Sequence, residues 1–320
     1  MTQVERIVFL DRQTLSPETV LRAPAFPHRF DMHDRTRPEE VAGRIADADI
    51  IITNKVRITA ADIAAAPRLR FIAVAATGYD VIDVPACVAR GIMVSNVRGY
   101  AVTTVPEHVF ALVLALRRSL FGYRQAVARG RWQEAAQFCF FDYPIRDLAG
   151  SMLGVVGSGA LGQATARLGA ALGMNVQFAG RKSDTGTEGR VPFETFLATS
   201  DVVTLHCPLN AETRGMIGDG EFAQMARRPL LINVGRGGLV DEHALARAFE
   251  RDLIASAAFD VTSPEPPAMD SPLMRLLQRP NFILTPHVAW ASREAIQILA
   301  DQLIGLIEAF RAGSPINRVA

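Results

Sequence analysis

The sequence predicts an α/β protein in which two domains are each built on a parallel β-sheet. The first observation behind this prediction is that short apolar runs alternate with helix-prone stretches, a pattern typical of parallel sheets buried on both faces. The second is that these runs form two series, separated by a long helical region at about residues 102–129. The third is a glycine-rich segment, 157–162, after the first strand of the second series, which is typical of a doubly wound nucleotide-binding sheet.

Bulk properties exclude several classes of protein. The chain has 320 residues, enough for two medium domains, and a formal net charge of +1, so we expect neither nucleic acid nor an anionic membrane as a partner. The cysteines Cys87, Cys139 and Cys207 form no CxxC pair, which argues against a disulfide framework and for a reducing compartment. No apolar run is typical of a signal peptide or approaches the ~20 residues needed to cross a bilayer. We therefore expect a cytoplasmic protein.

Each element of the first series has a local signal. Strands are expected where apolar residues run together, and helices where alanine-rich stretches begin near a proline or another start signal. The expected strands are 6–10, 49–53, 69–75 and 92–95, and the expected helices are 38–46, 59–66 and 84–89. Residues 17–34 lack a clear period, but a further short strand fits there.

The second series predicts a complete nucleotide-binding sheet. Its expected strands are 152–156, 175–178, 201–205, 230–234, 254–259 and 282–284. The final helix, 293–310, has no partner beside the last strand, so we expect it to pack on the first domain. The domains would then be residues 1–100 plus 291–320, which bind the substrate, and residues 101–290, which bind the dinucleotide. Residues 184–190 are the expected mobile surface loop.

The segment 157–162 has the spacing GxGxxG between an apolar strand and a helix-prone stretch. In that context the first glycine permits a tight turn, the second lets the backbone approach a pyrophosphate, and the third allows close helix–strand packing. The phosphates then meet free N–H groups at the helix start. The expected cofactor contacts are Gly157, Ser158, Gly159, Ala160 and Leu161. The alternative is a purely structural turn.

Two adjacent cations stand where an NAD-specific sheet carries an acid. Gly180, Arg181 and Lys182 follow the second strand of this series, whereas NAD-binding sheets place an Asp or Glu there to hold the ribose hydroxyls. Because arginine can bind a 2′-phosphate through two hydrogen bonds, the charge pattern favours NADP over NAD. The alternative is a solvated basic turn, with Asp184 or Glu188 as the hydroxyl partner.

Three later strands each end near one reactive side chain. Arg236 lies in a glycine-rich turn after strand 230–234, Glu265 lies in the segment after strand 254–259, and His287 follows strand 282–284. Because ligands bind beyond the carboxyl ends of parallel strands, we expect these side chains to converge. The further cofactor contacts expected at these strand ends are His206, Cys207, Pro208, Val234, Gly235 and Asp260, together with Arg236 and His287.

These residue types suit hydride transfer to a 2-oxo acid. The planar fork of Arg236 fits a carboxylate and its neighbouring carbonyl, and a protonated His287 can supply the proton that the reduced oxygen requires. Glu265 would favour the charged imidazole, and Asp260 would bind the nicotinamide carboxamide. The plainer alternatives are a surface or phosphate contact for Arg236, a proline-rich surface turn for Glu265, a structural strand end for His287 and a turn cap for Asp260. No metal site is expected.

Across nearly its whole length the chain resembles the D-2-hydroxyacid dehydrogenase family. The motifs that carry the resemblance are GSGALG at 157–162, HCPL at 206–209, NVGRGGLVDE at 233–242, Asp260 with Glu265 and Pro266, and TPH at 285–287. Within the family, the segments 52–56, 75–78 and 288–292 are most similar to the glycerate dehydrogenase (hydroxypyruvate reductase) group. The cations at 181 and 182 depart from the acid that many members carry.

The resemblance implies a Rossmann-like sheet inserted into a flavodoxin-like domain, and a homodimer formed largely through the linking helical region. It implies that Arg236, Glu265 and His287 are catalytic. It also implies that the backbone amides of a glycine loop hold the substrate carboxylate. The expected substrate contacts are Ala76, Thr77 and Gly78, with Arg236 and His287.

We therefore expect reversible reduction of a short 2-oxo acid with NADP or NAD. Hydroxypyruvate would give D-glycerate, and glyoxylate would give glycolate. A dehydrogenase for a bulkier 2-oxo acid is an alternative, because side chains that line a pocket cannot be placed from one sequence. A nucleotide-sensing corepressor with the same fold is a second alternative, which the retained catalytic residues disfavour.

Overall fold

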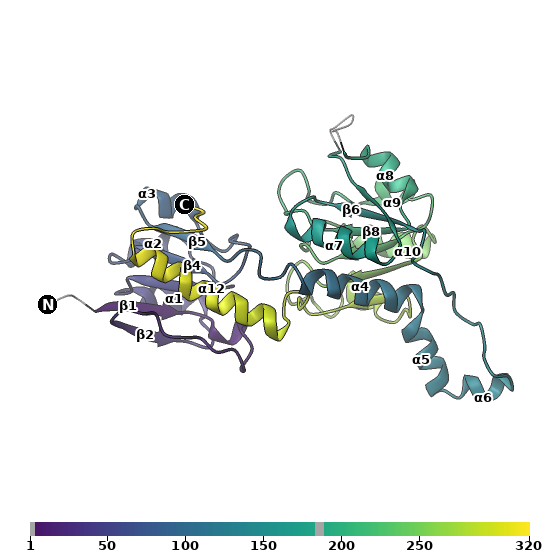
Figure 1. Cartoon of the computed structure of the whole chain (residues 1–320), viewed down its shortest axis with the longest axis horizontal. Coiled ribbons are helices and arrows are strands. Elements are labelled where there is room, and N and C mark those ends of the chain that lie inside the picture. The colour runs from purple at the N-terminus through teal and green to yellow at the C-terminus, as the bar shows by residue number, and fades with distance from the viewer. Residues whose placement is uncertain (1–3, 183–188) are drawn as a thin grey trace. The chain divides into compact units, whose positions relative to one another are not determined.

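The computed structural model describes residues 4–182 and 189–320, and the chain divides into two compact units. Unit 1 comprises Met1–Ala101 and Ala291–Ala320, and unit 2 comprises Val102–Trp290. Each unit contains one parallel sheet with helices packed against it (Figure 1). The predicted fold class, one parallel α/β domain inserted into another, is therefore confirmed. The surface loop expected at 184–190 lies largely outside the described residues.

The sheet of unit 1 has the strand order β2-β1-β3-β4-β5, which is the order of flavodoxin-like sheets. Its elements are β1 (Glu5–Phe9), a 3-10 turn η1 (Arg12–Thr14), β2 (His28–Met32), α1 (Pro38–Ile45), β3 (Ile50–Thr53), α2 (Ala60–Ala65), β4 (Phe71–Val74), α3 (Val84–Ala89), β5 (Met93–Asn96) and α12 (Arg293–Arg311). β2 occupies the stretch without a clear period. Because β2 is an edge strand with no fully buried residue, it needs no continuous apolar run.

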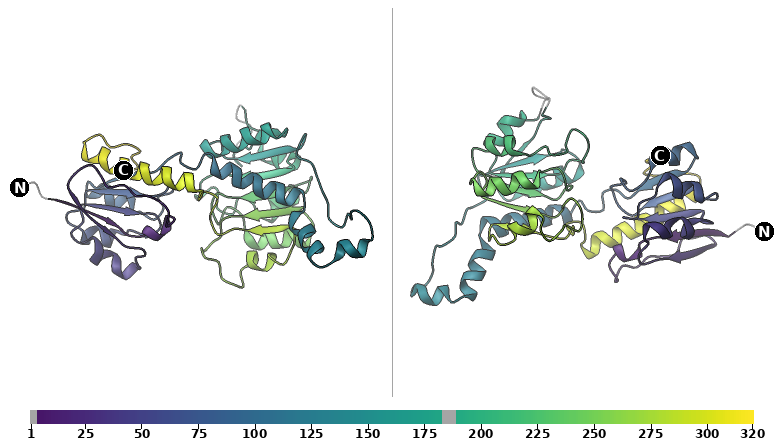
Figure 2. Two further views of the ribbon diagram at one scale, coloured as in Figure 1. Left: turned by 60° about the horizontal axis from the view of Figure 1, so that its bottom comes forward. Right: turned by 180° about the vertical axis from the view of Figure 1, so that it is seen from behind.

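The final helix returns to unit 1, as predicted. α12 packs against β4 and β5, and its Phe310 ring stacks on Phe71 with the centroids 4.4 Å apart. Its buried residues Leu299, Leu303 and Ile307 recur at the spacing of one helix face. The helix, yellow in Figures 1 and 2, therefore covers one face of the sheet formed by the first hundred residues.

The sheet of unit 2 has the order β11-β10-β9-β8-β6-β7, and all its strand pairs are parallel. Its elements are α4 (Thr104–Arg117), α5 (Leu120–Ala128), α6 (Arg131–Ala135), β6 (Met152–Val156), α7 (Ala160–Ala171), β7 (Asn175–Phe178), α8 (Phe193–Thr199), β8 (Val202–Leu205), α9 (Asp219–Gln224), β9 (Leu230–Asn233), α10 (Glu242–Glu250), β10 (Ser256–Phe259), α11 (Pro272–Leu276) and β11 (Phe282–Leu284). Counted within the unit, the order is 2-1-3-4-5-6. The direction of winding therefore reverses beside β6, where doubly wound sheets bind their ligands.

Helices cover both faces of this sheet (Figure 2). On one face α4 and α7 form a core with Leu153, Val155 and the alternate residues of the other strands. On the other face α8, α9 and α10 form a second core, which includes Val203 and Phe259. Burial on both faces explains why the central strands β6, β8, β9 and β10 are largely apolar in sequence. The edge strand β7 is only partly buried and alternates polar and apolar residues.

The long helical region predicted at about 102–129 consists of two helices. α4 ends at Arg117 and α5 begins at Leu120, because Ser119 between them adopts a left-handed conformation with φ of 51°. The Ser119 hydroxyl donates to the Pro144 carbonyl at 2.6 Å, which links this corner to the chain returning toward β6. α5 and α6 consequently form an arm that leaves the sheet of unit 2 (Figure 1).

Candidate active site

The pairing register aligns the carboxyl ends of the strands in unit 2. Val156, Leu205, Asn233, Phe259 and Leu284 pair in succession across the sheet. Residues shortly after these positions therefore emerge along one edge, which we call the carboxyl edge. The predicted site residues that follow these strand ends are Gly157, His206, Arg236, Asp260, Glu265 and His287.

The glycine loop between β6 and α7 has the packing expected of a phosphate-binding turn. Gly157 has φ of +100°, and a Cβ on it would lie 2.8 Å from the His206 carbonyl carbon. A Cβ on Gly162 would lie 2.0 Å from the Gly157 oxygen, whereas a Cβ on Gly159 would meet nothing within 4 Å. The chain itself therefore requires the first and third glycines. The second leaves open space beside the exposed start of α7, which fits a bound diphosphate.

At the end of β7, the two predicted cations differ in their surroundings. Lys182 Nζ lies 2.7 Å from Glu221 Oε1 and is engaged by that carboxylate. Arg181 is exposed. Gly180 is held against the next segment, because its N–H donates to the Val191 carbonyl at 2.8 Å. The alternative hydroxyl partners Asp184 and Glu188 lie outside the described residues.

A third cation at this corner was not predicted. Arg190 Nη2 donates to Ser158 Oγ at 2.9 Å, across 32 positions of sequence. The sequence offered no signal for it, since a single arginine before strand-like residues is usually a solvated side chain. The structure places it beside the second residue of the glycine loop.

The segment after β8 lines the glycine loop, as its predicted position implies. His206 Nε2 lies 3.0 Å from Thr204 Oγ1, and burial lowers the pKa of His206 to about 4. Burial also raises the pKa of the Cys207 thiol to about 11. Both side chains are therefore neutral near pH 7, and neither is suited to exchange a proton with a substrate at that pH. Pro208 continues the segment, and its carbonyl accepts a hydrogen bond from the Thr213 hydroxyl at 2.7 Å.

The turn that carries Arg236 is shaped by a buried asparagine. Asn233 Nδ2 donates to the Arg236 carbonyl at 3.0 Å, and Asn233 Oδ1 accepts from the Gly235 N–H at 3.1 Å. Val234 lies inside this turn. Arg236 Nη1 donates a further hydrogen bond to the Gly235 carbonyl at 2.8 Å. The turn is thus tied to the last residue of β9.

Glycine also brings the arginine turn against the segment that carries Glu265. A Cβ on Gly237 would lie 1.9 Å from the Thr262 carbonyl oxygen, so no other residue fits without moving one backbone. The Thr262 N–H in turn donates to Glu265 Oε1 at 3.2 Å. The two predicted catalytic segments are therefore in direct backbone contact.

The imidazole and the carboxylate predicted to act together are hydrogen-bonded. His287 Nδ1 lies 2.7 Å from Glu265 Oε2, and their side chains are 25% and 38% exposed. His287 has φ of 56°, a conformation that costs energy for a non-glycine residue and is common at functional sites. Trp290 Nε1 donates to the His287 carbonyl at 2.9 Å, which holds this strained backbone in place.

Asp260 accepts hydrogen bonds from the residues on both sides of His287. Its carboxylate is buried, accepts from the Val288 and Ala289 N–H groups at 2.9 and 2.8 Å, and accepts from the Thr285 hydroxyl at 2.5 Å. These bonds show that Asp260 organises the turn on both sides of His287, the plainer of its two predicted roles. Its contact with a nicotinamide carboxamide stays a prediction.

His108 of α4, which is not among the predicted site residues, completes this network. Its Nε2 lies 3.2 Å from Thr285 Oγ1 and 3.7 Å from Asp260 Oδ1. The signal available in the sequence was a polar residue on an otherwise apolar helix face. A cavity of about 570 Å³ opens beside the network, and its lining includes Glu265, His287 and Met274.

The predicted substrate loop belongs to unit 1. Ala76, Thr77 and Gly78 follow β4 at the carboxyl edge of the five-stranded sheet. Asn96 Nδ2 donates to the Thr77 carbonyl at 2.6 Å, and the Thr77 hydroxyl donates to the Val97 carbonyl at 3.0 Å. The loop is therefore held by its neighbour at the end of β5.

Within the residues that the structure describes, no group of three or more His, Cys, Asp or Glu side chains is arranged to hold a metal ion. In the same ranges, every helix is too short or too polar to span a bilayer.

Comparison with known proteins decides the family. Residues 110–289 match the NAD-binding domain of the D-isomer-specific 2-hydroxyacid dehydrogenases. The chain is also 49% identical over 316 residues to glycerate dehydrogenase from Methylorubrum extorquens, with 98% of this chain and 99% of the relative covered. The chain belongs to the D-isomer-specific 2-hydroxyacid dehydrogenase family. The predicted resemblance to this family, and within it to glycerate dehydrogenase, is confirmed.

Other members of the D-isomer-specific 2-hydroxyacid dehydrogenases are similar over the whole chain. Hydroxypyruvate reductase from Blautia hydrogenotrophica is 36% identical over 322 residues, with 98% of this chain and 99% of that protein covered. Among solved structures, the NADPH-dependent glyoxylate/hydroxypyruvate reductase from Sinorhizobium meliloti, in complex with NADP and malonate, has a TM-score of 0.83 at 27% identity. That match covers 99% of this chain and 97% of that structure.

Proposed function

We propose that this chain is a nicotinamide-dependent reductase of short 2-oxo acids. Hydroxypyruvate would give D-glycerate and glyoxylate would give glycolate, both reversibly. The observation that carries the proposal is the 2.7 Å contact between His287 Nδ1 and Glu265 Oε2, on a segment in backbone contact with the Arg236 turn. The similarity to glycerate dehydrogenase and hydroxypyruvate reductase supports the choice of substrates.

Each of the three residues Arg236, His287 and Glu265 has a different role in the proposed reaction. A bound nicotinamide supplies the hydride that reaches C2 of the 2-oxo acid. Arg236 binds the substrate carboxylate and polarises the carbonyl with its planar fork. His287 donates a proton to the carbonyl oxygen, and Glu265 orients the imidazole and stabilises its charged form. In the oxidative direction His287 takes the hydroxyl proton instead.

Because Nδ1 of His287 faces Glu265, we assign the proton exchange to Nε2. The left-handed backbone at His287 and the hydrogen bonds that the N–H groups of residues 288 and 289 donate to Asp260 fix the direction of the ring. Preorganisation of this kind is what a general acid needs, because a small displacement of the proton donor lowers the rate steeply.

The nucleotide would lie across the carboxyl edge of unit 2. We assign its diphosphate to the N–H groups at the start of α7 and its remaining contacts to the strand ends from β7 to β11. The basic residues after β7 favour NADP over NAD, since no carboxylate of the described residues after that strand stands where the ribose hydroxyls would be held.

We assign substrate binding to residues 1–100 and 291–320, and nucleotide binding to residues 101–290. Backbone N–H groups of Ala76, Thr77 and Gly78 would bind the substrate carboxylate. We further propose a cytoplasmic homodimer, formed through the linking helices and the α5–α6 arm. Large apolar side chains on this part of the chain are exposed, including Phe138 at 87% and Phe141 at 83%, as expected of a surface that a partner covers.

The test is a panel of 2-oxo acids assayed with NADPH and NADH in parallel. We expect the highest kcat/KM with hydroxypyruvate or glyoxylate and a clear preference for NADPH. A preference for a branched or aromatic 2-oxo acid would replace the proposed substrates with bulkier ones. Tight nucleotide binding without turnover on any acid would contradict the enzymatic function and favour a nucleotide sensor. Light scattering on the same sample tests the dimer.

A further inference from the structure

Arg190 lies at the outer corner of the six-stranded sheet. It directly precedes Val191, which pairs with Ala179 just beyond β7, and Val191 exchanges backbone hydrogen bonds with Phe178 and Gly180 at 2.9 and 2.8 Å. These bonds fix the backbone on the Val191 side of Arg190. β7 is the last strand of the sheet, so the arginine approaches the carboxyl edge from the side away from His287.

From this corner the Arg190 side chain reaches the glycine loop. Its Nη2 donates to Ser158 Oγ at 2.9 Å, and the residue is half-buried. The guanidinium therefore spans the space between the end of β7 and the loop that follows β6. That is where a dinucleotide-binding sheet holds the adenosine ribose, and where an arginine nearby accommodates a 2′-phosphate.

The charges around Arg190 also point to an anion. Lys182 is engaged by Glu221 at 2.7 Å, and Arg181 is exposed. Among the described residues, the hydrogen-bond partner of Arg190 is the neutral Ser158 hydroxyl, and no carboxylate pairs with it. Since the described residues give this half-buried guanidinium one neutral partner, it keeps donors for a phosphate, which it binds more strongly than a hydroxyl.

We propose that Arg190 binds the 2′-phosphate of NADP and is a specificity-determining residue for the cofactor. The proposal rests on nucleotide binding at the glycine loop, the function proposed above, and adds a residue that sequence position alone does not indicate. Ser158 acts as its positioning residue by holding the guanidinium over the loop. The diphosphate is a less suitable partner, because the start of α7 already offers it N–H groups.

The experiment measures dissociation constants by calorimetry for NADPH, NADH, 2′,5′-ADP and 5′-AMP. Arg190→Ala is expected to weaken NADPH and 2′,5′-ADP by about 10- to 100-fold, the range for one charged hydrogen-bond partner. The same variant is expected to leave NADH and 5′-AMP within about 2-fold, since neither carries the phosphate that Arg190 binds. Arg190→Lys should fall between the wild type and Arg190→Ala, because lysine keeps the charge but not the fork.

Two variants serve as matched controls. Arg167→Ala removes the same charge from an exposed position of α7 and is expected to leave all four constants unchanged. Arg181→Ala measures the contribution of the arginine that the sequence pattern indicates. Thermal unfolding of each variant shows whether the fold is retained.

The possible outcomes distinguish failure of the Arg190 assignment from failure of nucleotide binding itself. An equal loss for NADPH and NADH in Arg190→Ala would overturn the 2′-phosphate assignment and place the residue on the diphosphate or in the loop structure. Unchanged constants for NADPH would overturn it as well. If the wild type bound none of the four nucleotides, the proposed function itself would fail, independently of Arg190.

Discussion

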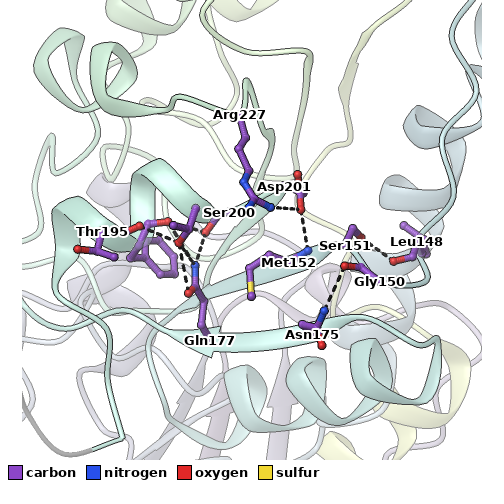
Figure 3. Close-up of polar contacts among 12 residues, drawn as sticks. Leu148, Gly150, Ser151, Met152, Asn175, Gln177, Thr195, Ser200, Asp201 and Arg227 are labelled. Atoms are coloured by element: carbon purple, nitrogen blue, oxygen red, sulfur yellow. Dashed lines mark hydrogen bonds and ion pairs between the residues drawn. The ribbon is translucent and has the colours of Figure 1, made fainter.

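Charged residues lie at both ends of the strands of the six-stranded sheet. They are held differently at the amino edge, where the strands begin, and at the carboxyl edge. At the amino edge, Asp201 accepts from the Met152 N–H at 2.8 Å and from Arg227 Nη1 at 3.0 Å (Figure 3). At the carboxyl edge, His287 meets Glu265 at 2.7 Å from a left-handed backbone. At the amino edge the Asp201 carboxylate accepts a hydrogen bond from the first residue of β6. At the carboxyl edge the His287–Glu265 pair places a proton donor on a residue with strained backbone.

Neighbouring polar groups strengthen this contrast. At the amino edge Asn175 Nδ2 donates to the Gly150 carbonyl at 3.1 Å, and further along β7 Gln177 Nε2 donates to the Thr199 and Ser200 hydroxyls at 3.0 Å each (Figure 3). These groups satisfy one another. At the carboxyl edge the conformations depend on glycines whose Cβ atoms would collide with backbone.

Cavity size does not distinguish the two edges. A cavity of about 520 Å³ at the amino edge includes Arg117, Asp201 and Arg227 in its lining, and one of about 570 Å³ at the carboxyl edge includes Glu265 and His287. What distinguishes them is strand direction and backbone strain. In parallel sheets the reactive end is the carboxyl end, and strained residues concentrate at functional sites.

The largest expected effect is at the histidine of the carboxyl edge. His287→Ala removes the proposed proton donor, so kcat with hydroxypyruvate is expected to fall by about 100- to 10,000-fold. Steady-state kinetics with NADPH measure it, and the dissociation constant of NADPH shows whether the nucleotide site is intact. A kcat within a few-fold of the wild type would assign the proton transfer to another group and remove the main contrast between the edges.

The next effect tests the backbone contact between the arginine turn and the Glu265 segment. Gly237→Ala puts a methyl group 1.9 Å from the Thr262 oxygen. Displacement of Arg236 is expected to lower kcat/KM by about 10- to 100-fold, and overpacking lowers the free energy of unfolding by about 1–3 kcal/mol. Gly220→Ala is the control, because a Cβ there meets nothing within 4 Å and lies in α9. Equal activity of the two variants would show that the contact does not position Arg236.

A smaller effect is expected at the amino edge, and it should appear in stability alone. Asp201→Asn weakens the bonds from Met152 and Arg227, which is expected to lower the free energy of unfolding by about 1–2 kcal/mol. The kcat per folded molecule should stay within about 2-fold, since the amino edge lies at the opposite end of the strands from the proposed site. Urea unfolding and kinetics on one preparation measure both. A large loss of kcat at full stability would make the amino edge part of the site.

The last prediction concerns how the free energy of unfolding depends on pH through His206 at the carboxyl edge. Burial lowers the pKa of His206 from the ordinary 6.5 to about 4, so the unfolded chain binds a proton there at a pH where the folded chain does not. This residue therefore contributes stability above about pH 6.5 that is lost as the pH falls toward 4. The free energy of unfolding of His206→Asn should fall less between pH 7 and pH 5 than that of the wild type. Identical losses would show that the folded imidazole is protonated like the unfolded one.

Much of the fold was predictable because its signals are local. The central strands of unit 2 are buried on both faces, so they appear as largely apolar runs, and the strand ends could be aligned with Arg236, Glu265 and His287. β2 was left open because an edge strand carries no such run. The break at Ser119 was missed because Ser119 Oγ bonds Pro144, 25 positions away.

The sequence by itself determined the α/β class, the family and the residue types at each strand end, since these depend on short-range periodicity and on motifs. Only the tertiary structure decided which side chains meet across long separations. It placed Arg190 on Ser158 and His108 of α4 beside Thr285, 177 positions away. It also set the left-handed backbone of His287 and the close approach of Gly237 to Thr262. Such contacts depend on how neighbouring loops pack at the edge of a sheet, and local sequence patterns carry no record of that packing.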